Sequence, residues 1–151
     1  MANYGTAWNK TGADSVLQLV ELIAAAATGI RRSKIFSFGI GCTAASNDGV
    51  HQYTVHRVTG TATGTAVTPQ PLDPADAIAF CTAKHLVTVD AASFAAGAEV
   101  YREPLNGRAS WQWNANPGKE IVSPATASNG VSLGVSAAST STYSGNVQHE
   151  E

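Results

Sequence analysis

The sequence predicts an all-β protein, a single-domain antiparallel β-sandwich that is most simply a jelly roll of about eight strands. Short runs rich in Val, Ile, Thr, Tyr and Phe alternate with turn residues at fairly regular intervals. The length of 151 residues suits one domain with one core. No internal repeat of the propeller or solenoid kind is visible. A mixed-type barrel is the alternative architecture.

The first 14 residues, MANYGTAWNKTGAD, are polar and contain two glycines. They have no apolar periodicity, so they predict an extended N-terminal arm over residues 1–14, followed by the jelly-roll domain over residues 15–151. Tyr4 and Trp8 lie in this arm. An aromatic side chain that its own segment cannot bury is expected to dock on another surface, of its own domain or of a neighbour. Both residues are therefore candidate protein contacts.

The segment Ser15–Ala27 fits two patterns. Its apolar residues include a set with helical spacing, but the same stretch also alternates as a strand does. Because the rest of the chain has strand patterns, we favour a strand that is buried on both faces.

Further strands follow along the chain. Lys34–Cys42 has one apolar face that is expected to point into the core. After turn residues at Ser46–Gly49 comes a strand over His51–Gly60, and another is expected at His85–Asp90. The apolar face of the predicted strand Lys34–Cys42 carries Phe36, Phe38, Ile40 and Cys42. Two last strands, GVSLGVSA and STYSGNVQH, end the predicted set.

A long connection, Thr61–Lys84, interrupts this series. Its three prolines exclude a central strand and leave room for one short helical turn near Pro74–Phe80. Proline fixes the shape of a loop before binding and lowers the cost of ordering it, so this connection is the second candidate contact region. The candidate residues in it are Pro69, Pro71, Leu72 and Pro74.

The stretch Glu99–Gly118 predicts a β-hairpin that is closed by a type I′ turn at Asn106-Gly107. Counting outward from this turn places Val100, Trp111 and Trp113 on one face of the hairpin. We expect that face to be core, because burying two indoles contributes more than any polar feature of the chain. A sugar-binding platform and a protein contact are the alternatives for the two tryptophans.

The same register predicts two contacts of charged side chains. Arg102 is expected to lie across Trp111 as a cation over an indole. On the opposite face, Glu103 is expected diagonal to Arg108.

Composition excludes several classes of function. The net charge is -2 and only 13% of the residues are charged, so neither nucleic acid nor an anionic membrane is an expected partner. No apolar run has the length of a transmembrane helix, and Met1 does not begin a secretory leader. No P-loop, nucleophile elbow or zinc-protease motif occurs, and GIGCTA lacks the helix that a dinucleotide site needs. The chain is expected to be no enzyme and to need no cofactor.

The remaining polar candidates are weak. His51 and His56 fall on opposite faces of a strand, so no metal site is expected there. A glycosidase-like carboxylate pair could come from Asp90, Glu99 and Glu103, but nothing in their spacing favours it. Glu150 and Glu151 predict a solvated tail or a docking tip. Two cysteines, Cys42 and Cys81, are expected to be buried thiols, with a disulfide as the alternative.

Much of the chain resembles a known group of proteins. From about Lys34 to Glu151 the pattern FGIG, SNDG, HQYTVHRVT, TAVTPQPLDPADA, LNGRASWQWNANPGKEIVSPATASNGVSL and HEE is similar to capsid decoration, or cement, proteins of tailed bacteriophages. The most distinctive pieces are TPQPLDPAD (Thr68–Asp76) and PGKEIVSPATASNG (Pro117–Gly130). No catalytic signature marks this group, and no functional residue carries over from it.

The resemblance implies a jelly-roll fold and a structural role in the virion. Such proteins typically form homotrimers on the outer capsid surface, where they bridge major capsid subunits and resist internal pressure. The protein would be made in the host cytoplasm and end on the virion. We expect the N-terminal arm to reach over the capsid protein or a neighbouring copy, with Tyr4 and Trp8 as anchors.

Two other classes of function are kept as alternatives. The stronger is a carbohydrate-binding jelly-roll module, on the virion surface or a fibre, that uses Trp111 and Trp113. The weaker is a small hydrolase, which the missing catalytic triad and metal cluster oppose.

Overall fold

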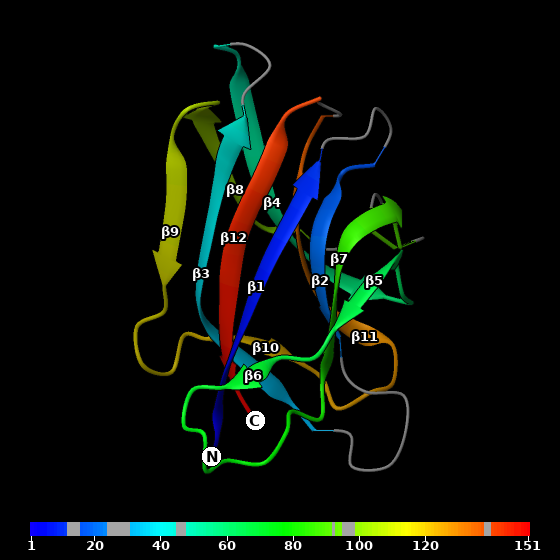
Figure 1. Cartoon of the computed structure of the whole chain (residues 1–151), viewed down its shortest axis with the longest axis vertical. Helices are drawn as coiled ribbons and strands as arrows, with labels where there is room; N and C mark the ends of the chain where they lie inside the picture. The colour runs from blue at the N-terminus through cyan, green and yellow to red at the C-terminus, as the bar shows by residue number, and fades with distance from the viewer. Residues whose placement is uncertain (12–15, 24–30, 45–47, 92, 95–98, 138–139) are drawn as a thin grey trace.

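The structure, a computed structural model, describes residues 1–11, 16–23, 31–44, 48–91, 93–94, 99–137 and 140–151. These residues form two antiparallel sheets and contain no helix, so none of them belongs to a helix that could span a membrane (Figure 1). The predicted all-β sandwich is confirmed.

Within the described residues the chain forms twelve strands, more than the eight that the sequence indicated. They are β1 (Asn3–Thr11), β2 (Gln18–Ile23), β3 (Ser33–Ala44), β4 (Val50–Thr59), β5 (Thr63–Val67), β6 (Gln70–Pro71), β7 (Thr82–Val89), β8 (Glu99–Asn106), β9 (Ser110–Asn114), β10 (Ile121–Ser123), β11 (Asn129–Val135) and β12 (Thr142–Glu150).

The chain crosses repeatedly between the two sheets. The first sheet has the order β10-β3-β12-β1-β6, with β9 also paired to β3, and the second has the order β5-β7-β2-β11-β4-β8. Strands β1 and β12 are neighbours, so the two ends of the chain lie side by side at one end of the molecule (Figure 1). The backbones of Ala2 and Glu151 exchange two hydrogen bonds there, of 3.2 and 3.1 Å.

The predicted N-terminal arm is replaced by a strand inside the first sheet. β1 pairs with β12 from Asn3 to Thr11 and with β6 on its other side. Its burial alternates strictly, and the buried side chains are Tyr4, Thr6, Trp8 and Lys10. The alternation could not be recognised in the sequence because two of the four buried residues, Thr6 and Lys10, are polar. Residues 12–15 lie outside the described part of the chain.

The second strand is confirmed. Gln18–Ile23 is an interior strand between β7 and β11, and the side chains of residues 18–22 are buried on both faces. Gln18 and Glu21 are buried with the apolar residues: the Gln18 amide donates to Glu21 at 3.2 Å and its oxygen accepts the Ala91 N–H at 2.9 Å.

A bulge changes the inner face of β3. Opposite β12, Ile35 pairs with His149 and Ser37 pairs with Gln148, so Phe36 is an extra residue. Because one inserted residue reverses the faces beyond it, Ile35 is buried and Phe36 is only half-buried. Phe38 and Ile40 point inward as predicted, whereas Cys42 is half-buried.

The predicted hairpin at Asn106-Gly107 is wrong. β8 pairs with β4 in the second sheet and β9 pairs with β3 in the first, so the turn connects the two sheets. The turn lies one residue further on, since the Ala109 N–H donates to the Asn106 carbonyl at 2.8 Å, and neither Asn106 nor Gly107 has the positive φ of a type I′ turn. Arg102 therefore binds Glu99 instead of covering Trp111, and Arg108 binds Asp48 at 2.6 Å instead of Glu103.

The main core lies between the sheets, and a smaller cluster lies beside it. Phe38, Tyr53 and Val55 are fully buried in the main core. The smaller cluster consists of Val16, Val58, Ala62, Val87, Ala91 and Phe94. Both cysteines are free thiols, so the alternative of a disulfide is wrong.

Candidate contact surface

The long proline-containing connection runs along the edges of both sheets. β5 is the edge strand of the second sheet and the two-residue β6 is the edge of the first, so no proline of the connection lies in a central strand. The last predicted residues, Thr82–Lys84, instead begin β7, which is a central strand between β5 and β2. The predicted helical turn is absent from the described Pro74–Phe80. A β-turn over Asp73–Asp76 takes its place, in which the Asp76 N–H donates to the Asp73 carbonyl at 3.0 Å and the Ala75 N–H donates to the Asp73 carboxylate at 2.9 Å.

The N-terminal strand holds one side of this connection. The Leu72 N–H donates to the Asn3 carbonyl at 2.8 Å, and Tyr4 is the register partner of Pro71. Beyond the turn, the Tyr4 hydroxyl donates to the Ala77 carbonyl at 3.0 Å. The segment Leu72–Phe80 is called the proline loop from here on.

The C-terminal end of the chain holds the other side of the proline loop. The carboxylate of Glu151 accepts the backbone N–H groups of Phe80 and Cys81, each at 2.8 Å. The guanidinium carbon of Arg31 lies 4.2 Å from the centre of the Phe80 ring. An irregular loop is thus fixed by both ends of the chain, so a partner that bound it would need to order it little further.

The proline loop presents apolar side chains to solvent. Leu72 is 54% exposed and Ile78 is 76% exposed, and Pro74 between them is also exposed. Exposed aliphatic side chains on a fixed loop are suited to a protein contact of modest area.

The six contact candidates from the sequence fall into two groups. Pro71, Leu72 and Pro74 lie at the surface, with Pro71 half-buried, whereas Pro69 is buried. Tyr4 and Trp8 are also buried, at 3% and 4% exposure, so their side chains pack inside their own domain and not against a partner. The structure therefore brings Tyr4, Pro71 and Leu72 together and separates Trp8 from them.

Trp111 and Trp113 are half-buried and pack against the core through Phe38. The Phe38 ring is 4.8 Å from Trp111 in an edge arrangement and 5.1 Å from Trp113 in a stacked one. Tyr101, from the other sheet, is tilted against Trp113 at 5.6 Å. The stacked Phe38 ring covers one face of the Trp113 indole, which a sugar ring then cannot use for stacking.

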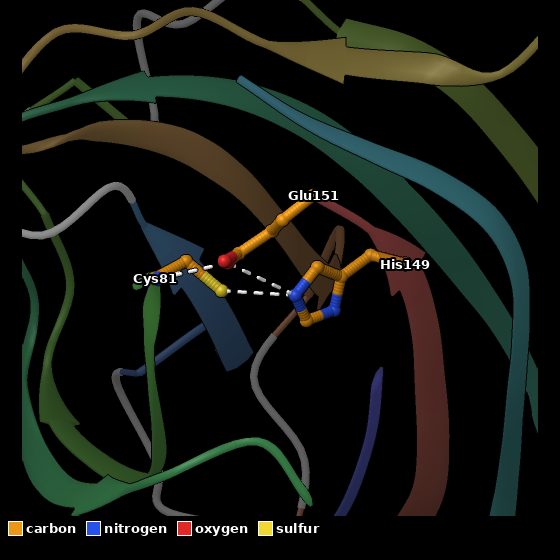
Figure 2. A group of neighbouring side chains, drawn as sticks. All are labelled: Cys81, His149 and Glu151. Carbon is orange, nitrogen blue, oxygen red and sulfur yellow. Dashed lines mark hydrogen bonds and ion pairs between the residues drawn. The ribbon is translucent and has the colours of Figure 1, made fainter. Parts of the chain in front are cut away.

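A cluster beneath the proline loop has no counterpart among the sequence predictions. The Sγ atom of Cys81 lies 3.1 Å from Nε2 of His149, which lies 3.4 Å from Oε1 of Glu151 (Figure 2). The side chains of His149 and Glu151 are 0% and 1% exposed, and the Tyr4 ring stacks on the imidazole at 5.3 Å. The prediction of a solvated tail is thus wrong for Glu151.

Burial and hydrogen bonding act in opposite directions on the two acids of this cluster. Burial raises the pKa of the Cys81 thiol, and the neighbouring Glu151 raises it further. For Glu151, burial opposes ionisation, but hydrogen bonds from His149, Cys81 and the backbone outweigh it and lower the pKa to about 2. The cluster therefore holds a buried carboxylate beside a neutral thiol. One sequence signal for it exists: His149 and Glu151 are two residues apart and so share a strand face.

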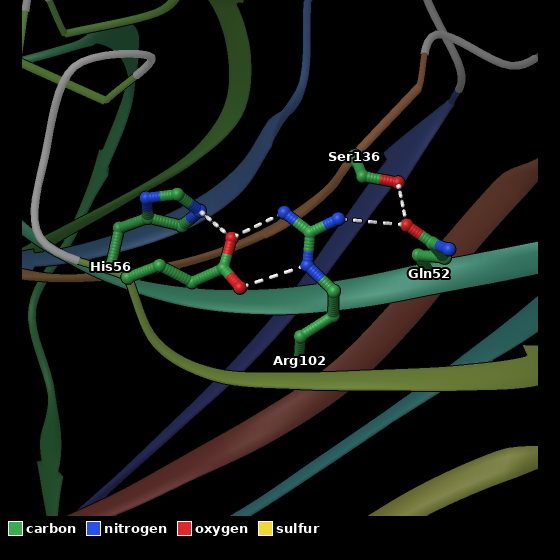
Figure 3. Close-up of polar contacts among 5 residues, drawn as sticks. Gln52, His56, Arg102 and Ser136 are labelled. Atoms are coloured by element: carbon green, nitrogen blue, oxygen red, sulfur yellow. Dashed lines mark hydrogen bonds and ion pairs between the residues drawn. The ribbon is translucent and has the colours of Figure 1, made fainter.

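Two of the three carboxylates named for a catalytic pair, Glu99 and Asp90, have structural partners. Glu99 makes a two-point contact with Arg102, at 2.8 and 2.7 Å, and lies 3.7 Å from Nε2 of His56. Arg102 also donates to Gln52, which accepts from Ser136, so the network joins β4, β8 and the end of β11 (Figure 3). Because these groups are partly exposed, the network contributes little stability.

Asp90, a second of the three acids named for this role, binds backbone. Its two carboxylate oxygens accept the N–H groups of Leu17 and Gln18, at 3.0 and 2.7 Å. It thereby fixes the start of β2 against the end of β7.

Comparisons with protein-family models, with curated proteins and with solved structures gave no match to this chain.

Proposed function

We propose that this protein is a structural virion component, a capsid decoration protein that binds the outer surface of a phage head and stabilises contacts between major capsid subunits. The observation that carries the proposal is the proline loop. It is held by hydrogen bonds from both ends of the chain, yet it exposes Leu72 and Ile78. A loop of this kind is built to contact another protein without first becoming ordered.

The strand order supports the jelly-roll part of the proposal. Eight of the strands form the orders β1-β12-β3-β9 and β2-β11-β4-β8. Consecutive members of this set alternate between the sheets except for β4 and β8, as in an eight-stranded roll of two Greek keys. β5, β6 and β7 then form an insertion between β4 and β8, and this insertion carries the proline loop.

The contact differs from the one expected from the sequence. Tyr4 and Trp8 act inside the domain, so the N-terminal segment supports the contact surface from below and does not reach over the partner. The exposed residues of the proline loop take that role. In a homotrimer on the capsid, each copy would direct one such loop toward the major capsid protein.

The proposal is tested with matched pairs of surface substitutions. Ile78→Ser and Leu72→Ser remove apolar surface from the proline loop. The controls are Val50→Ser and Val89→Ser, whose side chains are 71% and 58% exposed elsewhere on the molecule. Each variant is added to phage heads that lack the protein, and bound copies are counted by sedimentation and by electron microscopy.

We expect the two loop variants to bind at least about 10-fold more weakly, since each removes an aliphatic contact of roughly 1.5–3 kcal/mol when buried. The two controls are expected to bind like the unmodified protein. Equal occupancy for all four variants, or failure of the unmodified protein to bind any head, would refute the proposed function.

A further inference from the structure

The cluster beneath the proline loop brings three different electron-donating groups to one point. Sγ of Cys81, Nε2 of His149 and a carboxylate oxygen of Glu151 lie within 4.8 Å of one another (Figure 2). All three side chains are buried, and they join the start of β7 to the end of β12.

Two protons, one on the thiol and one on Nε2, cannot place a hydrogen bond in each of the three contacts between these atoms. If the thiol and the imidazole both donate to Glu151, then Sγ and Nε2 lie 3.1 Å apart with no proton between them. If the thiol instead donates to Nε2, that nitrogen has no proton for the carboxylate 3.4 Å away. A cation at the centre accepts a lone pair from all three atoms at once.

The spacing is close to that of a zinc site. Zinc bonds of about 2.0–2.3 Å in a tetrahedron place neighbouring ligand atoms about 3.5 Å apart. The observed separations of 3.1 and 3.4 Å are slightly shorter, so the ligands need only small outward movements. Thiolate, imidazole and carboxylate are also the three ligand types that zinc takes from proteins.

We propose that Cys81, His149 and Glu151 bind a zinc ion, with the fourth tetrahedral position left for water. The ion displaces the proton of the Cys81 thiol to solvent, and its two positive charges balance the thiolate and the carboxylate in the buried site. The backbone N–H groups of Phe80 and Cys81 orient the Glu151 carboxylate, as outer-shell partners do in metal sites. Zinc would thus tie the proline loop to β12.

The test uses the full chain, purified without a histidine tag and kept reduced. Zinc content is measured after dialysis, and affinity is measured by competition with a chromogenic chelator. Cobalt replaces zinc in a parallel sample, because a thiolate bound to cobalt gives a charge-transfer absorption band. Cys81→Ser removes one ligand, and Cys42→Ser is the matched control at the half-buried second thiol.

We expect about one zinc ion per chain, and a rise in melting temperature when zinc is added to the metal-free protein. Cys42→Ser keeps both properties and the cobalt band. Cys81→Ser loses the band. Its zinc affinity falls by more than the roughly 10- to 100-fold that the loss of an outer-shell partner costs, because a direct ligand is removed.

Two results would overturn the zinc site. The first is an unmodified protein that retains no zinc and gains no thermal stability from it, which would leave a hydrogen-bonded cluster. The second is equal zinc affinity in Cys81→Ser, which would place the ion elsewhere. Neither result depends on binding to a capsid.

Discussion

The hydroxyl of Tyr4 donates a hydrogen bond to the carbonyl of Ala77, 73 positions further along the chain and 3.0 Å away. The bond joins an interior strand to a loop that has no regular secondary structure. On the same side of the loop, the Leu72 N–H binds the Asn3 carbonyl. The first strand therefore determines the shape of the surface on which the proposed contact depends.

Tyr4→Phe is expected to loosen the proline loop while leaving the sandwich folded. The substitution keeps the ring that stacks on His149 but removes the hydrogen bond, which costs about 0.5–1.5 kcal/mol. Amide hydrogen exchange should become faster in residues 72–80 and stay unchanged in β3 and β11. Tyr101→Phe, at an exposed tyrosine, is the control. Unchanged exchange in the loop would show that the hydroxyl has no such role.

Gly145→Ala is expected to destabilise the protein by about 3 kcal/mol or to prevent folding. Gly145 is the register partner of Trp8, and a Cβ atom there would lie 2.0 Å from the Gly39 carbonyl oxygen and 2.7 Å from the Trp8 indole. Neither the strand backbone nor the buried indole has room to move. Urea denaturation measures the loss.

Gly41→Ala is the matched control for this substitution. Its added Cβ would meet Ser110 at an ordinary 3.4 Å, so its stability should change by less than about 1 kcal/mol. Similar losses in both variants would mean that the close approach at Trp8 is not what requires glycine.

The sequence predicted the elements in which apolar alternation is local and failed where polar residues are buried. β11 and β12 were found because their apolar residues repeat with the strand period, and β2 was assigned as a strand because the rest of the chain has strand patterns. β1 was missed because two of its inward positions are occupied by the polar residues Thr6 and Lys10. Lys10 can be buried because its ammonium group donates hydrogen bonds to the carbonyls of Val16 and Gln18. No pattern within residues 1–14 can reveal those partners.

Two further errors have a similar origin. The chain does turn at Asn106–Ala109, but the presence of a turn does not decide whether the next strand continues in the same sheet. The cluster of Cys81, His149 and Glu151 joins residues about 70 positions apart. Only the folded arrangement of β7 and β12 brings them together.

Glu21→Gln is expected to become increasingly stabilising as the pH rises above about 4.5. Oε2 of Glu21 accepts the Ala62 N–H at 2.7 Å and the Gln18 amide at 3.2 Å, and burial raises the pKa of this carboxyl. The folded state therefore holds a proton that the unfolded state has released, and wild-type stability falls as the pH rises through this range. Glutamine keeps an acceptor oxygen and cannot ionise.

Urea denaturation at about pH 5 and about pH 8 measures this difference. Glu21→Leu is the comparison: it cannot ionise either, but it leaves the Ala62 N–H without its acceptor, so it should be less stable than Glu21→Gln by about 1–3 kcal/mol at both pH values. If Glu21→Gln lost the same stability at both pH values, the carboxyl would be ionised in the folded protein as it is in the unfolded one.

Because Lys10 is buried, the free energy of unfolding is expected to increase as the pH rises from about 8 to about 10.5. Burial lowers the pKa of this amine to about 8, although the nearby Asp90 raises it. In that range the unfolded chain still binds a proton that the folded protein has lost, so stability increases with pH by up to about 1.4 kcal/mol per unit. Lys10→Met removes this contribution, whereas Lys119→Met, at an exposed lysine, retains it.

The measurement is the difference in unfolding free energy between wild type and Lys10→Met at several pH values, because the titration of tyrosines and other lysines cancels in it. That difference should shift in favour of wild type as the pH rises through this range. A difference that does not change with pH would mean that Lys10 keeps its ordinary pKa and that the carbonyls of Val16 and Gln18 compensate fully for its burial.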